Sequence, residues 1–286
     1  MANSRPVNKK NNSKYAFRRF CAFVVILVFV WWFNNYTLKI TETSIASVKI
    51  AEPVKLAVIS DLHAHTGSIS NKKILGKINK ISPDIVVIMG DMYSRGSSEH
   101  EKNIAIELMT DIAAEYITYF VPGDHDTSMA YMESLSDVGI HVMNYKSEII
   151  EIKNNSFKIM GIDNVHYTST FDLTNAFAID ENCYNILLAH IPNFSKFADF
   201  GADLTICADT HGGMVQLPFG LGAGYDSLTD RWFPELRGDE NVYDKGWFDY
   251  ENGSMFITSG IGDSPYPVRF CNRPEVVSLE IIPGQR

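Results

Sequence analysis

Short apolar segments that each end near an aspartate or a histidine are the feature that most limits what this chain can fold into. The polar side chains that follow these segments are, in chain order, Asp61, His63, Asp91, Asp124, His125, Asp126, His190, Asp209 and His211. The carboxyl ends of parallel strands meet at one edge of a sheet, so we expect these side chains to converge there. Clustered carboxylates and imidazoles are typical metal ligands, and the pattern therefore predicts a metal site at a sheet edge.

Apolar spacing predicts alternating strands and helices first and mostly strands later. Helices are expected over 71–81, 99–114 and 127–135. Strands are expected over 55–60, 85–89, 116–121, 141–144, 147–153, 157–161, 185–189, 204–208, 254–258 and 276–282, with a hairpin turn at Asn154 and Asn155. This layout predicts an α/β fold, a four-layer αββα sandwich of two mixed sheets flanked by helices. We expect the parallel half first and the more antiparallel half second.

The first 36 residues differ from the rest of the chain. An unbroken apolar run covers 20–33, and the residues before and just after it are the basic lead Arg5, Lys9, Lys10, Lys14, Arg18 and Arg19 and the aromatic Trp31, Trp32 and Tyr36. The run is shorter than the ~20 residues of an ordinary membrane span and overlaps a signal-peptide core, but no small-residue cleavage motif follows it. We expect an uncleaved single-pass membrane anchor with the later domain extracytoplasmic. A cleaved signal and twin-arginine export are the alternatives.

We expect a basic lead plus anchor over 1–36, a linker over 37–52 and a globular domain over 53–286. An opening edge strand is the alternative to the linker. The net charge is −9 and no basic stripe follows residue 19, so we expect no duplex nucleic acid as a partner. The four cysteines form no Cys-x-x-Cys pair, which argues against a zinc ribbon or a redox motif. The sequence leaves the oligomeric state open.

Each polar motif is a weak signal when taken alone. Asp-x-His at Asp61 and Gly-Asp at Asp91 are most often turns or helix caps, and a lone His190 is most often a core histidine. Gly-Asp-His-Asp over 123–126 and Thr-His-Gly-Gly over 210–213 are more specific, because paired glycines let the backbone approach a ligand. The conjunction of all of them at strand ends is what indicates a metal site.

The order and spacing of these motifs resemble the calcineurin-like metallophosphoesterase superfamily, over residues 54–282. The superfamily pattern is Asp-x-His, Gly-Asp, Gly-Asn-His-Asp/Glu, His and Gly-His-x-His. The segments 211–218, 259–270 and 273–276 are further similar to a bacterial membrane-associated branch that includes UDP-2,3-diacylglucosamine pyrophosphatases. The resemblance implies a phosphoesterase that acts on a phosphodiester or a pyrophosphate, with a lipid or cell-envelope metabolite as the preferred substrate.

The resemblance also implies a binuclear centre whose two ions activate a hydroxide for in-line displacement. The first ion would be bound by Asp61, His63, Asp91 and His211, and the second by Asp91, Asp124, His190 and Asp209. His125 would assist the leaving group instead of binding metal. Asp126 would orient and charge His125, with a helix cap as the alternative role for Asp126.

Two ligand positions depart from the superfamily pattern, and both belong to the second ion. Asp124 replaces an asparagine, and Asp209 replaces the first histidine of Gly-His-x-His. An oxygen-rich site favours hard ions, so we expect two metal ions, Mn or Fe before Zn, Mg or Ca. The alternative function is a catalytically impaired module that binds metal or phosphate.

An aromatic-rich segment near the end of the chain has two possible roles. Its members are Trp232, Phe233, Tyr243, Trp247, Phe248 and Tyr250. They either line a groove for lipid or substrate, or form a packed cap over a sheet.

Overall fold

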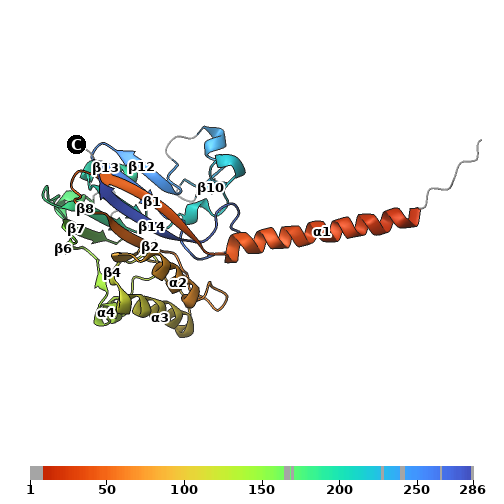
Figure 1. Cartoon of the computed structure of the whole chain (residues 1–286), viewed down its shortest axis with the longest axis horizontal. Helices are drawn as coiled ribbons and strands as arrows, with labels where there is room; N and C mark the ends of the chain where they lie inside the picture. The colour runs from red at the N-terminus through yellow and green to blue at the C-terminus, as the bar shows by residue number, and fades with distance from the viewer. Residues whose placement is uncertain are drawn as a thin grey trace, which may run out of the picture.

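The structure is a computed structural model that describes residues 9–163, 168, 171–226, 229–238, 242–264 and 266–284. Two mixed sheets form its centre (Figure 1). The first sheet has the strand order β1 (Lys39–Ser47), β14 (Glu275–Pro283), β2 (Val54–Ile59), β3 (Ile85–Ile88), β4 (Ile117–Phe120) and β5 (His141–Val142). Strand β14 is antiparallel to β2, whereas the other neighbours are parallel.

The second sheet is antiparallel at both edges and parallel in the middle. Its strand order is β12 (Gly246–Tyr250), β13 (Gly253–Ile257), β9 (Leu204–Cys207), β8 (Tyr184–Ala189), β7 (Asn155–Ile162) and β6 (Lys146–Ile152). The pairs β12–β13 and β6–β7 are antiparallel. The hairpin between β6 and β7 turns at Lys153 and Asn154, one residue before the expected position, because Lys153 adopts a left-handed backbone with φ 54°.

Helices cover the outer face of each sheet, which confirms the expected layered sandwich. The helices α2 (Asn71–Ile81), α3 (Glu99–Glu115) and α4 (Met129–Asp137) pack against the first sheet in one apolar cluster. The short helix α5 (Phe194–Phe200) packs against the second sheet in another. A third cluster, which includes Leu56, Val87 and Ile186, fills the space between the sheets. The parallel strands are therefore buried on both faces, as their continuous apolar runs predict.

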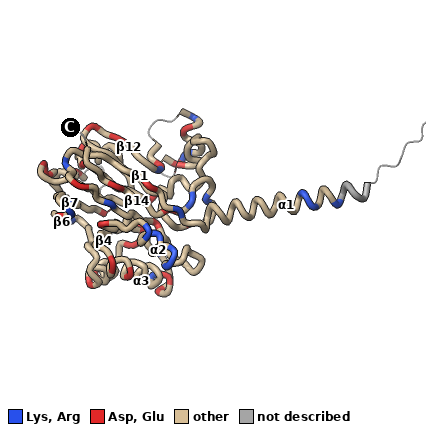
Figure 2. The backbone as a smooth tube through the Cα atoms, viewed as in Figure 1, with Lys and Arg blue, Asp and Glu red and all other residues tan. Residues whose placement is uncertain are grey.

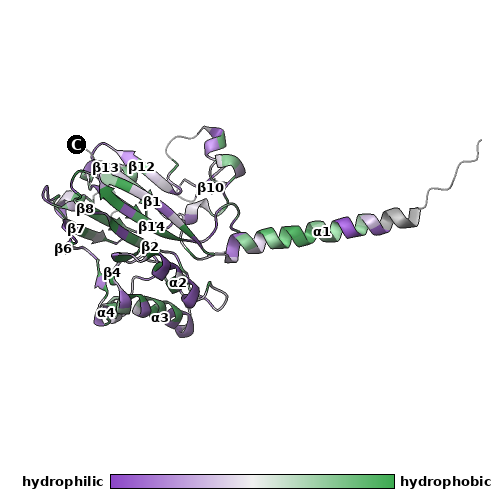
Figure 3. Ribbon diagram, in the orientation of Figure 1, coloured by the Kyte–Doolittle hydropathy of each residue, from purple (hydrophilic) through white to green (hydrophobic). Residues whose placement is uncertain are grey.

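Helix α1 (Lys9–Tyr36) projects from the domain (Figure 1). Its segment Lys14–Tyr36 is long and apolar enough to cross a membrane, and Figure 3 shows the apolar stretch in green. The part of the basic lead before Lys9, including Arg5, lies outside the described residues. Residues 39–47 are not a linker: they form the edge strand β1, which pairs in parallel with β14. The edge-strand alternative for this segment is therefore the one that the structure contains.

Candidate metal centre

The predicted site residues converge where the strands of both sheets end. Asp61, Asp91 and Asp124 follow β2, β3 and β4 of the first sheet, and His190 and Asp209 follow β8 and β9 of the second. His63, His125, Asp126 and His211 lie one or two positions further along the same loops. The convergence arises because parallel strands end at a common edge.

Several site residues have a backbone conformation that is rare outside glycine. The residues with left-handed φ are Asp61 at 48°, His63 at 42°, Asp91 at 53°, Asp209 at 68° and His211 at 49°. Non-glycine residues in this region are uncommon, and such strain concentrates at functional sites. In this conformation the backbone aims side chains from several loops into one volume.

Two glycines let the loops approach one another closely. A Cβ atom on Gly123 would lie 2.0 Å from Asp91 Oδ1, and one on Gly90 would lie 2.3 Å from the backbone nitrogen of Gly123. Gly90 also has a φ of +84°. A side chain at Gly123 would displace Asp91, and one at Gly90 would displace the backbone at Gly123, so the glycines of these motifs are required by packing.

Asp91 lies at the centre of the cluster. Its Oδ1 accepts a hydrogen bond of 2.9 Å from the backbone N–H of His125. Its Oδ2 lies 3.5 Å from His190 Nε2, 3.6 Å from His63 Nε2 and 3.9 Å from His125 Nε2. The same carboxylate oxygen therefore faces groups from both sheets.

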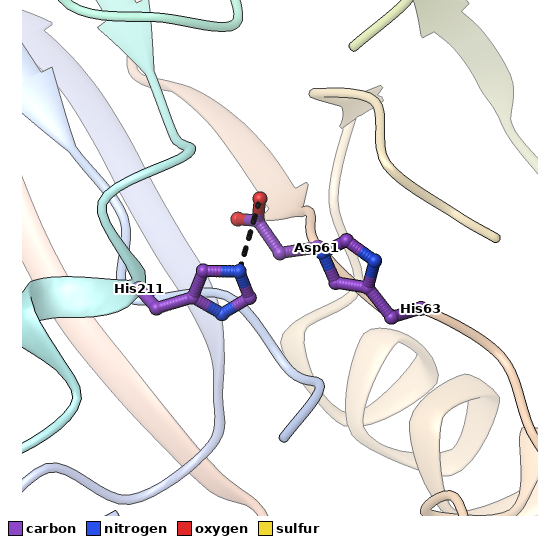
Figure 4. A group of neighbouring side chains, drawn as sticks. All are labelled: Asp61, His63 and His211. Carbon is purple, nitrogen blue, oxygen red and sulfur yellow. Dashed lines mark ion pairs between the residues drawn. The ribbon is translucent and has the colours of Figure 1, made fainter. Parts of the chain in front are cut away.

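One group of candidate ligands consists of Asp61, His63 and His211 (Figure 4). Asp61 Oδ1 lies 4.0 Å from His211 Nε2. The two imidazoles stack with ring centroids 5.2 Å apart, and His63 Nδ1 lies 2.9 Å from the Ser94 hydroxyl. A ligand atom from each of the three residues lies within 4.8 Å of the others.

A second group consists of Asp124, His190 and Asp209. His190 Nε2 lies 3.7 Å from Asp209 Oδ1, while His190 Nδ1 is hydrogen-bonded to the carbonyl of Met89. Because Nδ1 must donate to that carbonyl, Nε2 is the nitrogen with a free lone pair in the neutral ring. The ring is thus oriented as in a histidine that binds metal.

Two buried atoms in the cluster have no hydrogen-bond partner. They are Asp61 Oδ1 and His190 Nε2, which lie 3.8 Å apart. A buried polar atom without a partner is costly. Two donors that each bind a shared ion at ~2.1 Å are about 3.4 Å apart at near-tetrahedral angles. Within the two expected ligand sets, Asp91 lies 3.6 Å from His63 and 3.5 Å from His190, and His190 lies 3.7 Å from Asp209. The residues present therefore fit a metal site.

The pKa values of the cluster without metal also fit a metal site. Burial raises the pKa of Asp61 to about 7, against the opposing effect of His190, and burial also raises the pKa values of Asp124 and Asp209. Burial lowers the pKa of His63 to about 4. Although burial disfavours its charged form, the pKa of His190 lies well above its usual value because Asp91 and other carboxylates surround it. Carboxyl groups that lie close together and have raised pKa values indicate a site that a bound cation would stabilise.

His125 has a defined tautomer in its neutral form. Its Nδ1 accepts a hydrogen bond of 2.8 Å from the backbone N–H of Arg95, so the proton resides on Nε2, which faces Asp91 and Asp124. The Arg95 guanidinium donates to the Asp124 carbonyl at 2.7 Å and is largely exposed. Sequence reasoning missed Arg95. The available signal was a cation four residues after Asp91 in a loop rich in serine and glycine.

The expected role of Asp126 beside His125 is wrong. Asp126 is fully buried, and its two oxygens accept hydrogen bonds from the backbone N–H groups of Gly123 at 2.7 Å and Met92 at 3.0 Å. Backbone donors occupy both carboxylate oxygens, and the His125 imidazole instead accepts from the backbone N–H of Arg95. Asp126 is not the helix cap either, since Ser128 precedes α4. It joins the loops that carry Asp91 and Asp124.

Arg269 is a second residue that sequence reasoning did not single out for the site. Its side chain is 1% exposed, and its guanidinium donates to the carbonyls of Gly262 at 2.8 Å and Ser259 at 2.7 Å and lies 3.4 Å from His211 Nδ1. The Asn35 side chain binds the Arg269 backbone in both directions, at 2.8 Å and 3.1 Å. The end of α1 therefore reaches the residue that packs against His211.

A cleft of about 830 Å³ opens above the cluster. Its floor carries Asp91, His125 and His211, and its walls include Trp232 and Phe233. The aromatic-rich segment divides between its two possible roles. Trp232 and Phe233 line the cleft, whereas Tyr243, Phe248 and Tyr250 pack on the second sheet. Trp247 joins the core between the sheets, with its Nε1 donating to Thr43 at 2.7 Å.

Comparison with known proteins gives relatives of one kind. The chain is 26% identical over 243 residues to the phosphodiesterase YaeI of Escherichia coli strain K12, covering 81% of this chain and 83% of that protein. It is 23% identical over 216 residues to YkuE of Bacillus subtilis strain 168, an uncharacterised metallophosphoesterase, covering 72% and 70%. It is 24% identical over 263 residues to a transmembrane protein with a metallophosphoesterase domain from Danio rerio, covering 84% and 56%.

Among solved structures, the protein TT1561 of Thermus thermophilus matches with a TM-score of 0.46 and 9% identity, over 73% of this chain and 91% of that one. Residues 54–213 match the family described as calcineurin-like phosphoesterase. This match spans more than half of the chain and contains every strand-end residue from Asp61 to His211. The chain therefore belongs to the calcineurin-like phosphoesterase family, and it is a metallophosphoesterase, a hydrolase of phosphate esters.

Proposed function

We propose that this protein hydrolyses a phosphodiester or a pyrophosphate through a binuclear metal centre, with a lipid or cell-envelope metabolite as the preferred substrate. The observation that carries the proposal is the pair of ligand groups that meet at Asp91 on the floor of the cleft. One carboxylate oxygen that faces both groups is what a bridging ligand requires. YaeI, a relative at 26% identity, is named a phosphodiesterase.

The proposed ligands divide into two sets. Asp61, His63, Asp91 and His211 would hold the first ion, and Asp91, Asp124, His190 and Asp209 the second. Two bound ions would supply an activated water nucleophile and would neutralise charge on the attacking and leaving oxygens.

The protein's own groups provide the proton transfer and the substrate contacts. His125 carries its proton on Nε2 at the floor of the cleft, because Nδ1 already accepts from Arg95. In this proposal His125 donates that proton to the leaving oxygen. The exposed guanidinium of Arg95 lies beside His125 and suits bidentate binding of a phosphate. A pocket of about 490 Å³ that includes Arg95 and His63 adjoins the cleft.

The second ion is the part of the centre that distinguishes this chain. Four carboxylates, Asp61, Asp91, Asp124 and Asp209, contribute to the two proposed ligand sets. Three of them, all except Asp61, belong to the second set, so the second site is rich in oxygen. We expect it to bind Mn or Fe in preference to Zn. Elemental analysis of protein from its native host tests this, and two tightly held zinc ions in the fully active protein would contradict it.

A catalytically impaired module that binds metal or phosphate is the competing function. It is favoured by Asp124 and Asp209, which lower the positive charge available to attract an anionic substrate. The test is turnover of a soluble bis-aryl phosphodiester by the full chain in detergent with added Mn²⁺. Turnover that disappears in His125→Ala and Asp61→Ala supports the enzyme. His141→Ala is the matched control, since His141 pairs with Glu148 at the edge of the first sheet. If the protein shows no turnover with any metal, the result supports the binding module.

We further propose that α1 (Lys9–Tyr36) is a membrane anchor and that the catalytic domain, which includes the edge strand β1, lies on the extracytoplasmic side. The basic residues before the apolar run support this orientation. Protease protection in intact cells tests it, and a domain that resists external protease in cells with permeable outer layers would contradict it. Similarity to the UDP-2,3-diacylglucosamine pyrophosphatase branch stays a prediction.

A further inference from the structure

Two surfaces beside the base of α1 have no role in the chemistry proposed above. The lysine face of α2 consists of Lys72, Lys73, Lys77 and Lys80. The apolar rim consists of Trp232, Phe233, Tyr266 and Val268, which line the cleft, and of Phe219 and Leu221, which are exposed in the loop between the cleft residues Val215 and Gly224. The two surfaces differ in chemistry but lie next to the same helix end.

The lysine face is unusual in a protein with a net charge of −9. Helix α2 contains no acidic residue, and its buried Ile74 and Ile78 turn the lysines outward. None of the lysine ion pairs in the described part of the chain involves these four lysines. They share a groove of about 420 Å³ with Trp32 and Tyr36 of α1, and Figure 2 shows the blue segments of α2 beside the base of α1.

The apolar rim exposes large side chains that a soluble surface rarely presents together. Phe219 is 97% exposed, Tyr266 68% and Trp232 61%. Phe219 is also held with a left-handed φ of 65°. Contiguous exposed apolar residues around a cleft mark a surface that contacts a partner or a membrane.

The rim is tied directly to α1. Trp31 Nε1 donates to the carbonyl of Pro267 at 2.7 Å, and Pro267 lies between the rim residues Tyr266 and Val268. Asn35 holds the backbone of Arg269 in both directions. These contacts fix the rim at the level of the aromatic end of the helix, where Trp residues sit at a membrane interface.

We infer that the lysine face and the apolar rim together form a docking surface for a bilayer that contains anionic phospholipids. The apolar helix that leaves from the centre of this surface determines the occupant, since any partner seated there must lie against the membrane that α1 enters. Lysines beside the helix end attract phospholipid phosphates, and the apolar rim inserts among the headgroups.

The docked orientation has a consequence for the active site, which rests on the proposed function. Trp232, Phe233 and Val268 of the rim also line the cleft. With the rim in the interface, the mouth of the cleft opens onto the bilayer. An amphipathic phosphoester would then enter from the membrane plane, with its apolar part against the cleft-lining Trp232, Phe233 and Val268 and its phosphate at the metal centre.

A probe of membrane contact tests the docking without any need for activity. Phe219→Cys is labelled with an environment-sensitive fluorophore in the full chain, with the exposed Cys21 and Cys271 replaced by serine. Ile149→Cys is the matched control, because Ile149 is 59% exposed on the edge strand β6 of the second sheet. In phosphatidylglycerol-containing vesicles, spin-labelled lipid should quench the probe at residue 219 and leave the probe at residue 149 unquenched. Equal quenching at the two positions, or none at either, would overturn the inference.

A charge variant tests the lysine face. Replacement of Lys72, Lys73, Lys77 and Lys80 by glutamine should reduce quenching at residue 219 in phosphatidylglycerol vesicles to the level in pure phosphatidylcholine. The matched control replaces the same number of lysines elsewhere, at Lys49, Lys146, Lys153 and Lys158. High salt should reproduce the effect of the first variant. If phosphatidylglycerol increases the quenching at residue 219 equally in both variants, the lysine face has no role and the inference fails.

An activity comparison separates the docking from the proposed function. Phe219→Ser with Leu221→Ser, two rim residues that border the cleft without lining it, should slow hydrolysis of a vesicle-embedded phosphodiester lipid by about ten-fold. Turnover of a soluble bis-aryl phosphodiester should stay unchanged. Unchanged hydrolysis of both substrates contradicts the docking alone, whereas no turnover of either substrate by the unsubstituted protein contradicts the proposed function alone.

Discussion

At the scale of the residue, the site combines buried acids with strained backbones. Asp61 and Asp91 are almost completely buried and left-handed, and Asp61 Oδ1 has no hydrogen-bond partner. Such an arrangement destabilises the metal-free protein, because ionised carboxylates lie close together in a medium of low polarity. Bound ions would offset this cost, so function and stability are in conflict at these positions.

We expect Asp61→Asn to stabilise the metal-free protein at pH 8. Burial raises the folded-state pKa of Asp61 to about 7, above its usual value of 3.8. Its contribution to stability is therefore fully present below pH 3.8 and is lost as the pH rises through about 7. The shift is about three units at roughly 1.4 kcal/mol each, so the gain from removing the charge should be about 4 kcal/mol. Urea unfolding of the chelator-treated full chain at pH 5 and pH 8 measures this gain. If the free energy of unfolding falls from pH 5 to pH 8 by the same amount in the variant as in the parent, the expectation is contradicted.

We expect Asp209→His to shift metal preference towards zinc. Asp209 Oδ1 lies 3.7 Å from His190 Nε2, so an imidazole at this position would add a softer nitrogen donor to the second group. Competition binding should show a relative affinity for Zn²⁺ over Mn²⁺ that rises by about ten-fold. Asp249→His on the exposed face of β12 is the control. An unchanged preference in Asp209→His would mean that Asp209 is not a ligand.

The convergence of the candidate ligands could be predicted from the sequence, but their hydrogen-bond partners could not. Each proposed ligand follows an apolar strand, and strand ends converge in any parallel-rich sheet. The position of Asp126 depends on which donor lies nearest in three dimensions, and the backbone N–H groups of Met92 and Gly123 occupy it. Arg269 escaped notice because its guanidinium binds backbone carbonyls, which leave no pattern in the sequence.

At the scale of the element, the strands and helices of the sandwich follow their sequence patterns closely. Helix α2 covers the expected residues Asn71–Ile81, because buried isoleucines recur at helical spacing and Ser82 ends the helix in a left-handed conformation. Strand β1 was harder to predict, since an edge strand of alternating exposure resembles a polar linker. Helix α1 is the element whose role changes most, because its end packs against the catalytic domain.

We expect Asn35→Ala to weaken both the fold and the metal centre. The substitution removes two hydrogen bonds to the buried backbone of Arg269, whose guanidinium lies 3.4 Å from His211 Nδ1. Each buried backbone group left without a partner costs about 1–3 kcal/mol. Calorimetry should show a lower unfolding temperature together with weaker binding of one ion.

Asn34→Ala is the matched control for this variant. Asn34 donates within its own helix to the carbonyl of Val30. Equal effects of the two substitutions on metal affinity would show that the contact between Asn35 and Arg269 has no influence on His211.

At the scale of the whole molecule, two sheets supply the two halves of one centre. The first sheet carries Asp61, Asp91 and Asp124, and the second carries His190 and Asp209. The apolar layer between the sheets sets their separation, and each ligand group takes residues from both sheets, so the distances within each group depend on the core. The sequence could predict the layers, but the position of the cleft mouth beside α1 depends on how the loop after β13 packs against that helix.

Metal titration of the chelator-treated full chain by calorimetry tests the central claim most directly, because it counts the ions that the two groups hold. We predict two Mn²⁺ ions for each chain, one ion in His190→Ala or His211→Ala, and the parent count in the control His141→Ala. A parent protein that binds one ion or none, or that keeps both ions in these two histidine variants, would contradict the binuclear centre.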